Sequence, residues 1–308
     1  MNIVLLDAKT LGDDISLDKF KSCGEFISYQ TTSKEQTLDR VKNAEVVITN
    51  KVVIDREIME NSQIKLICVA ATGMNNIDLE YAKEQNIVVK NVAGYSTNSV
   101  VQLTFSHLFY LLNKLRYFDE YSKNSWSSSD IFTHLGEPFS EIASKKWGII
   151  GLGEIGKKVA QIAQTFGAEV VYYSTSGKNK NTDYKNVDLE TLLKESDIIS
   201  IHCPLNAQTL NLLDKNNLPL LKDETILINM GRGGIINEED LGDAIDNQNI
   251  YVGTDVISSE PIPKNSPYLS VKNQNRLFIT PHIAWASKEA RERLVVKIIE
   301  NITNFNNR

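Results

Sequence analysis

The stretch from Lys145 to Thr175 constrains the fold of this chain more than any other. An apolar run, Trp147–Ile150, leads directly into the sequence GLGEIG at residues 151–156. A helical pattern follows at once, and a second apolar run then covers Val170–Tyr173. The order is strand, glycine turn, helix and strand. This stretch therefore predicts a βαβ unit with its glycine turn at the start of the helix.

The glycines of this turn suit a dinucleotide. Gly151 permits the tight turn, Gly153 lets the backbone approach a pyrophosphate, and Gly156 lets the helix pack on the strand. The first helical turn, which includes Glu154 and Ile155, directs N–H groups and the positive end of the helix at phosphates. Glycines of this spacing also occur in purely structural turns. Because both flanking elements agree with the motif, we predict a dinucleotide site.

The second strand lacks the acidic residue that usually follows it. Ser174 and Thr175 come next, with no Asp or Glu before Asp183. An acid here would bind the ribose hydroxyls and repel a 2′-phosphate. Ser174 and Thr175 are therefore the candidate ribose contacts, and Lys178 and Lys180 add positive charge unless they only decorate a solvated loop. We expect NAD or NADP to be accepted, with at most a moderate preference.

Composition narrows the class of protein. A chain of 308 residues is long for one core and comfortable for two domains. The net charge, 33 − 39 = −6, argues against a nucleic-acid or acidic-membrane surface. Three cysteines without a CxxC pair suggest neither a disulfide framework nor a zinc site, and we expect no metal. The first residues read as a strand rather than a signal peptide, so we expect a cytoplasmic protein without a membrane segment.

Apolar runs alternate with helix-compatible segments before the glycine turn. The expected strands cover residues 3–6, 26–29, 46–48, 66–70 and 87–90. This alternation predicts a parallel sheet with helices on both faces, to which a C-terminal helix over 288–304 returns. The loop 70–78 follows the fourth strand, where ligands of open α/β sheets gather, and its N–H groups could hold a carboxylate. A plain strand-to-helix turn with Asp78 near the helix start explains the local chemistry equally well.

A long apolar helix is expected from about Asn98 to Tyr121. The segment after it, 125–140, is polar and aromatic without clear periodicity. It is either a surface loop or an arm that reaches a second subunit. Because Trp126, Ile131 and Phe132 are too apolar for a free loop, we predict a homodimer, the alternative being that these side chains cover their own domain.

Four further strands carry polar groups at their carboxyl ends. The runs cover residues 197–205, 225–229, 251–254 and 277–280. Their loops share the sheet edge along which a bound dinucleotide would lie. Candidate cofactor contacts in these loops are His202, Cys203, Pro204, Thr209, Asn229, Met230, Gly231, Asp255 and Ala284.

Three residues of these loops suit hydride-transfer chemistry on an acid. Arg232, between glycines, has the planar fork that holds a carboxylate. His282 suits proton transfer near neutral pH, and Glu260 could orient its ring and favour the imidazolium. Each has an ordinary alternative: a surface arginine, a packed histidine, a Glu-Pro turn. Their coincidence on one sheet edge favours function, whereas His107 and His134 lie in an apolar helix and an aromatic loop.

The order of the motifs GLGEIG, HCPL, NMGRGG, DVISSEP and PHIAW resembles the D-isomer-specific 2-hydroxyacid dehydrogenase family. The resemblance covers essentially the whole chain. It implies an α/β fold with two doubly wound parallel-sheet domains. A Rossmann NAD(P)-binding domain, 98–283, would be inserted into a flavodoxin-like substrate domain made of 1–97 and 284–308.

The resemblance also implies roles for particular residues. Arg232, Glu260 and His282 would form the catalytic trio, and Asp255 would contact the nicotinamide end of the cofactor. The implied substrate contacts are Thr72, Gly73, Met74 and Trp285.

Within the family, PHIAWAS is most similar to the glycerate dehydrogenase and hydroxypyruvate reductase branch. That similarity implies reduction of hydroxypyruvate or glyoxylate by NAD(P)H in a homodimer. The chain departs from the family at Gln102, where Glu is commoner, and at Ser174, where Asp is usual. A nucleotide-sensing corepressor on the same fold is the alternative, although nothing resembles its added regulatory tail. A formate dehydrogenase relative is disfavoured because that branch typically has Gln where this chain has Glu260.

Overall fold

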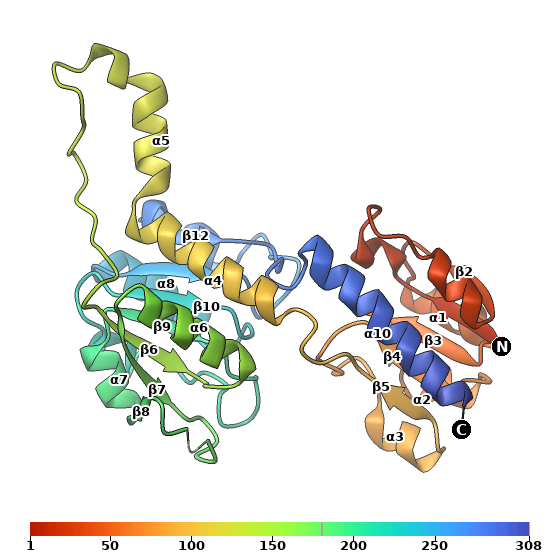
Figure 1. The fold of residues 1–308 in the computed structure, drawn as a ribbon. Coiled ribbons are helices and arrows are strands. Elements are labelled where there is room, and N and C mark those ends of the chain that lie inside the picture. The colour runs from red at the N-terminus through yellow and green to blue at the C-terminus, as the bar shows by residue number, and fades with distance from the viewer. Residues whose placement is uncertain (180, 308) are drawn as a thin grey trace. The chain divides into compact units, whose positions relative to one another are not determined.

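The computed structural model describes residues 1–179 and 181–307, so Lys180 lies outside the described residues. The chain forms two compact units (Figure 1). The first contains Met1–Ser96 and Trp285–Arg308, and the second contains Thr97–Ala284. Each unit is described by itself below. Within the described ranges, no helix is both long and apolar enough to cross a membrane.

The first unit is built on a five-stranded parallel sheet. Its strands are β1 (Asn2–Leu5), β2 (Glu25–Ser28), β3 (Val46–Thr49), β4 (Leu66–Val69) and β5 (Val88–Lys90). Their order is β2-β1-β3-β4-β5, which is the flavodoxin-like order. Strands β3 and β4 are buried along their whole length, as expected where helices cover both faces of a parallel sheet.

Helices cover both faces of this sheet. They are η1 (Ala8–Leu11), η2 (Asp18–Cys23), α1 (Lys34–Val41), α2 (Arg56–Glu60), α3 (Leu79–Glu84) and α10 (Lys288–Asn306). One core joins the sheet to α10, η1 and η2, and the other joins it to α1, α2 and α3. Because α10 comes from the chain terminus, this unit is assembled from both ends of the sequence.

The second unit is built on a seven-stranded parallel sheet. Its strands are β6 (Lys146–Ile150), β7 (Glu169–Tyr173), β8 (Lys185–Asn186), β9 (Ile198–Ile201), β10 (Ile226–Asn229), β11 (Tyr251–Thr254) and β12 (Leu277–Ile279). Their order is β12-β11-β10-β9-β6-β7-β8. This is the Rossmann order with one added edge strand, and it reverses between β6 and β9. The predicted fold class is confirmed.

The helices of the second unit are α4 (Thr97–Leu112), α5 (Leu115–Asn124), η3 (Trp126–Ser128), α6 (Glu154–Thr165), α7 (Leu189–Glu195), η4 (Leu218–Leu220), α8 (Glu238–Asn247), α9 (Pro267–Ser270) and η5 (Gln274–Arg276). Whereas α5, η3 and η5 contain no buried residue, the helices with buried residues pack on both faces of the sheet. Trp147 of β6 is fully buried among them, and its indole N–H donates to Ser200 Oγ at 2.9 Å. That bond removes the cost of burying the polar end of a large apolar side chain.

The single helix expected over 98–121 is wrong. Lys114 adopts a left-handed backbone conformation with φ 51°, which ends α4 and starts α5 in a new direction. Helix α5 has no buried residue, and Figure 1 shows it projecting with the following segment from the rest of the second unit. Phe132 and Leu135 in that segment are 89% and 82% exposed. These two apolar side chains therefore do not cover their own domain.

Candidate active site

The glycine turn after β6 has room for phosphate. At Gly151, φ is +94° and a Cβ would lie 2.7 Å from the backbone nitrogen of Cys203. A Cβ at Gly156 would overlap the carbonyl oxygen of Gly151. Gly153, by contrast, has no atom within 4 Å of its Cβ position, and helix α6 begins directly after it. A dinucleotide pyrophosphate fits this open space at a helix N-terminus.

His202 also fits a bound polar ligand. It follows β9, the strand beside β6 at the point where the strand order reverses. Both ring nitrogens are shielded from solvent, and neither has a hydrogen-bond partner among the described residues. Burial lowers the pKa of this imidazole to about 3, so the ring is neutral at neutral pH. Buried polar atoms are normally paired, so these two nitrogens indicate a site for polar ligand atoms.

Several other predicted cofactor contacts have buried side chains that shape their own loops. Burial raises the pKa of the Cys203 thiol to about 11, and the Thr209 hydroxyl donates to Pro204 O at 2.7 Å. The Asn229 amide accepts from Gly231 N and donates to Arg232 O, both at 3.0 Å. These side chains hold the strand-end loops in position.

The loop after β10 presents Arg232. Its guanidinium is exposed, donates to Gly231 O at 2.9 Å, and forms no ion pair in the part of the chain that the structure describes. The next residue, Gly233, has no room for a Cβ, which would overlap the backbone carbonyl of Ile257. The loops after β10 and β11 are thus packed backbone to backbone, with Arg232 left available for an anion.

Glu260 and His282 are brought together from the loops after β11 and β12. Glu260 Oε2 lies 2.7 Å from His282 Nδ1, and the two side chains are 32% and 23% exposed. The ring therefore donates Nδ1–H to the carboxylate, which leaves Nε2 for proton exchange. His282 has φ 53°, and its backbone N–H donates to the carbonyls of Asp255 and Thr280 at 2.9 Å each.

Asp255 holds the backbone around His282. Its carboxylate accepts from Thr280 Oγ1 at 2.6 Å and from the N–H groups of Ile283 and Ala284 at 2.8 Å each. The side chain is 1% exposed, and burial raises its pKa above the usual value for aspartate. The family resemblance implies a nicotinamide contact here. No sequence signal marks the loop-holding role, because the partners are mostly backbone groups.

The other predicted substrate contacts lie in the first unit. Thr72 Oγ1 donates to Val92 O at 3.0 Å, so the loop that contains Gly73 and Met74 is tied to the segment after β5. The Asp78 carboxylate caps α3 by accepting from Tyr81 N at 2.9 Å, which is the strand-to-helix turn considered above. Trp285 packs against the core of this unit.

Comparison with known proteins identifies the family. Residues 105–284 match the family model described as D-isomer specific 2-hydroxyacid dehydrogenase, NAD binding domain. The chain belongs to this family. It is similar to the hydroxypyruvate reductase of Blautia hydrogenotrophica, with 36% identity covering 99% of this chain and 97% of the relative. It is also similar to the glycerate dehydrogenase of Methylorubrum extorquens, with 34% identity covering 98% and 95%.

Among solved structures, the acyclic imino acid reductase Bsp5 in complex with NADPH and D-Arg matches with a TM-score of 0.87. It has 30% sequence identity, and the match covers 100% of this chain and 97% of that one. The chain is thus an NAD(P)-dependent D-2-hydroxyacid dehydrogenase, and its NAD-binding domain lies in the second unit.

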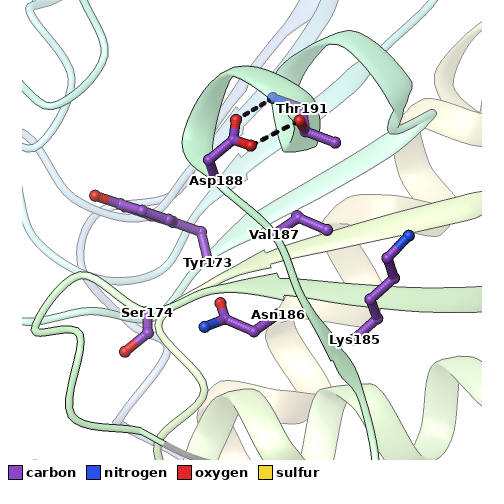
Figure 2. A pocket seen from close by; sticks show the side chains of 7 residues that line it. All are labelled: Tyr173, Ser174, Lys185, Asn186, Val187, Asp188 and Thr191. Carbon is purple, nitrogen blue, oxygen red and sulfur yellow. Dashed lines mark hydrogen bonds between the residues drawn. The ribbon is translucent and has the colours of Figure 1, made fainter.

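In this dehydrogenase, Ser174 lines a cavity of about 540 Å³ beside β7 (Figure 2). The lining residues are Tyr173, Ser174, Lys185, Asn186, Val187, Asp188 and Thr191. Figure 2 shows both oxygens of Asp188 engaged with Thr191, at 2.8 Å to its N–H and 2.9 Å to its hydroxyl. The one acid of the wall is therefore occupied in capping α7, while Lys185 adds a cation. Sequence reasoning missed Lys185 because β8, which carries it, is only two residues long.

Proposed function

We propose that this dehydrogenase reduces hydroxypyruvate or glyoxylate with NAD(P)H, forming D-glycerate or glycolate. The observation that carries the proposal is the Glu260–His282 pair, 2.7 Å apart, on strand-end loops beside the loop of Arg232. This arrangement supports acid–base chemistry on a carboxylic acid rather than nucleotide sensing alone. The hydroxypyruvate reductase and glycerate dehydrogenase relatives support the substrate class.

In the proposed reaction the glycine turn before α6 would hold NAD(P)H, which would supply the hydride for the carbonyl carbon of the substrate. Arg232 holds the substrate carboxylate through two parallel hydrogen bonds and so orients the carbonyl. His282 Nε2 gives its proton to the carbonyl oxygen as that oxygen becomes a hydroxyl. Glu260 keeps the ring oriented by accepting its Nδ1–H. The substrate contacts at Thr72, Gly73, Met74 and Trp285 belong to the same proposal and rest on the family resemblance.

The family resemblance also supports the proposed division of labour. Residues 1–97 and 284–308 would act as the substrate domain, and 98–283 as the NAD(P)-binding domain.

We also propose a cytoplasmic location. The three cysteines are free thiols, and disulfides are rare in reducing compartments.

A panel of small 2-oxo acids tests the substrate assignment. The purified protein would be assayed with NADH and with NADPH on hydroxypyruvate, glyoxylate, pyruvate and 2-oxoglutarate. We expect the highest kcat/KM on hydroxypyruvate or glyoxylate. A clear preference for pyruvate, or no turnover of any of these acids, would refute the substrate assignment.

Replacing Glu260 with glutamine is expected to lower kcat for reduction by roughly 10-fold or more, because small misplacements of a reacting group are costly. The amide keeps the shape of the side chain but removes the charged acceptor that orients the His282 ring through Nδ1. Steady-state kinetics of the variant and the unmodified enzyme on hydroxypyruvate measure the loss. An unchanged kcat would contradict the pairing.

Replacing Ser174 with aspartate is expected to shift cofactor choice toward NADH. The carboxylate would accept from the ribose hydroxyls and repel a 2′-phosphate. We expect the ratio of kcat/KM for NADH over NADPH to rise by roughly 1–3 kcal/mol, the scale of a single-contact discrimination. Ser176→Asp, on an exposed residue of the same loop, is the matched control and should shift the ratio less. Strict rejection of NADPH by the unmodified protein would contradict the argument.

The active unit is expected to be a homodimer formed through the second unit. Phe132 and Leu135 are 89% and 82% exposed on the segment after α5, and such apolar surface is typical of an interface. Light scattering at micromolar concentration should give twice the 34.6 kDa mass of the chain. Phe132→Ser with Leu135→Ser should release monomers, whereas Val53→Ser, at a 55% exposed site of the first unit, should not. A fully active monomeric wild type would overturn this expectation.

A further inference from the structure

The geometry points to His107 as a positioning residue that acts on His282 through Thr280 and Asp255. The inference rests on the proposed function, because it concerns the same proton donor. His107 lies on α4, far along the chain from the loops that carry the chemistry. Its position within an apolar helix carries no sequence signal for a role in the reaction.

The imidazole of His107 lies in the interior of the second unit, in a space that is open because residue 253 is glycine. The side chain is fully buried, and a Cβ on Gly253 of β11 would lie only 2.8 Å from its Nδ1. Its ring lies 4.5 Å from that of Phe278 on β12, measured between centroids. Burial lowers the pKa of the imidazole to about 4. At neutral pH the ring is therefore neutral and carries a single N–H.

The hydrogen bonds of Thr280 decide which nitrogen carries that proton. The Thr280 hydroxyl donates its one hydrogen to Asp255 Oδ1 at 2.6 Å. It must therefore accept from His107 Nε2, which lies 2.9 Å away. Nδ1 is then left without a hydrogen-bond partner among the described residues. Burying an unpaired nitrogen costs stability, and an apolar side chain at this position would avoid that cost. What histidine supplies in return is its hydrogen bond to Thr280.

Asp255 connects the Thr280 hydroxyl to the backbone around His282. Its backbone carbonyl accepts from His282 N at 2.9 Å, and its carboxylate accepts from the next two N–H groups. Because φ of His282 is 53°, the loop holds an uncommon conformation for a residue with a side chain. The hydrogen bonds from His107 to Thr280 and from Thr280 to Asp255 thus fix the Asp255 carboxylate. That carboxylate in turn holds the backbone around His282, so that the His282 ring stays directed at Glu260.

Kinetic variants separate positioning from simple packing. His107→Leu removes the donor and fills the space, and Thr280→Val removes the hydroxyl without changing shape. Each is expected to lower kcat on hydroxypyruvate by roughly 10-fold to 10²-fold, because small misplacements of a reacting group are costly. KM and the Kd of NADH should change little. His107→Gln, whose amide can replace the Nε2–H donor, should restore most of kcat.

A double-mutant cycle tests the route of the effect. If His107 acts through Thr280, the double variant should be no slower than the slower single variant. Thr104→Val is the matched control, since Thr104 is a buried hydroxyl on the same helix that bonds only Val100 O within the described residues. We expect this variant to retain kcat. Effects that multiply in the double variant, or a normal kcat in His107→Leu, would overturn the inference.

Nitrogen-15 NMR of the imidazole rings gives a readout that does not depend on turnover. In the unmodified protein His107 is expected as the neutral Nε2–H tautomer, and the ring signals of His282 should shift in His107→Leu and less in His107→Gln. An Nδ1–H tautomer, or unmoved His282 signals, would refute the network. If the wild type reduces no 2-oxo acid, the proposed function fails and these spectra still decide the positioning role.

Discussion

Replacing His282 with asparagine is expected to lower kcat for reduction by about 10²–10⁴-fold, the usual contribution of a positioned acid–base group. Asparagine cannot act as an acid near neutral pH, so the carbonyl oxygen would take its proton from water. Asparagine is also the matched choice for the backbone, since it tolerates the left-handed conformation that His282 adopts with φ 53°.

Cofactor binding serves as the control for this variant. The loops that form the glycine turn are remote in sequence from His282, so the Kd of NADH, measured by fluorescence titration, should stay within a few-fold of the wild-type value. A His282→Asn enzyme that retains a near-normal kcat would show that the proton comes from another group.

Replacing Arg232 with lysine is expected to reduce kcat/KM by on the order of 10²-fold or more on every 2-oxo acid that the enzyme accepts. Lysine keeps the charge but not the planar fork that grips both carboxylate oxygens. The guanidinium forms no ion pair in the described part of the chain, so the change should cost little stability. Steady-state kinetics on hydroxypyruvate and glyoxylate measure the loss.

Arg276→Lys is the matched control for that substitution. Arg276 donates to Gln248 O at 2.9 Å and lies at the amino end of β12, whereas the catalytic loops follow the carboxyl ends of the strands. Its replacement should leave kcat/KM within about 2-fold, as expected for a conservative change away from the site. Equal losses in both variants would mean that Arg232 has no special place in the reaction.

The sequence was sufficient to predict the fold class, because its signals are local and periodic. Apolar runs mark buried parallel strands, and the glycines at 151, 153 and 156 locate the turn into α6. These signals led to the two parallel sheets that the structure contains. The break between α4 and α5 was missed, because Lys114 carries no residue-type signal for its left-handed conformation.

Part of the candidate site was also accessible from the sequence. Arg232, Glu260 and His282 each follow a strand, so their placement on one edge follows from the direction of parallel strands. The hydrogen-bonded chain through Thr280 and His107 was not accessible, because it joins a strand end to a helix more than a hundred residues away. Such contacts depend on three-dimensional packing, which no spacing rule encodes.

The configuration of the product tests the central claim most directly. Hydroxypyruvate would be reduced by the purified enzyme with NADH and with NADPH, and the glycerate formed would be resolved by chiral chromatography. Membership of a D-isomer specific family, together with the proposed proton donor His282 and the proposed carboxylate clamp Arg232, predicts D-glycerate as the only product. L-Glycerate, a mixture of both enantiomers, or no glycerate would contradict the account.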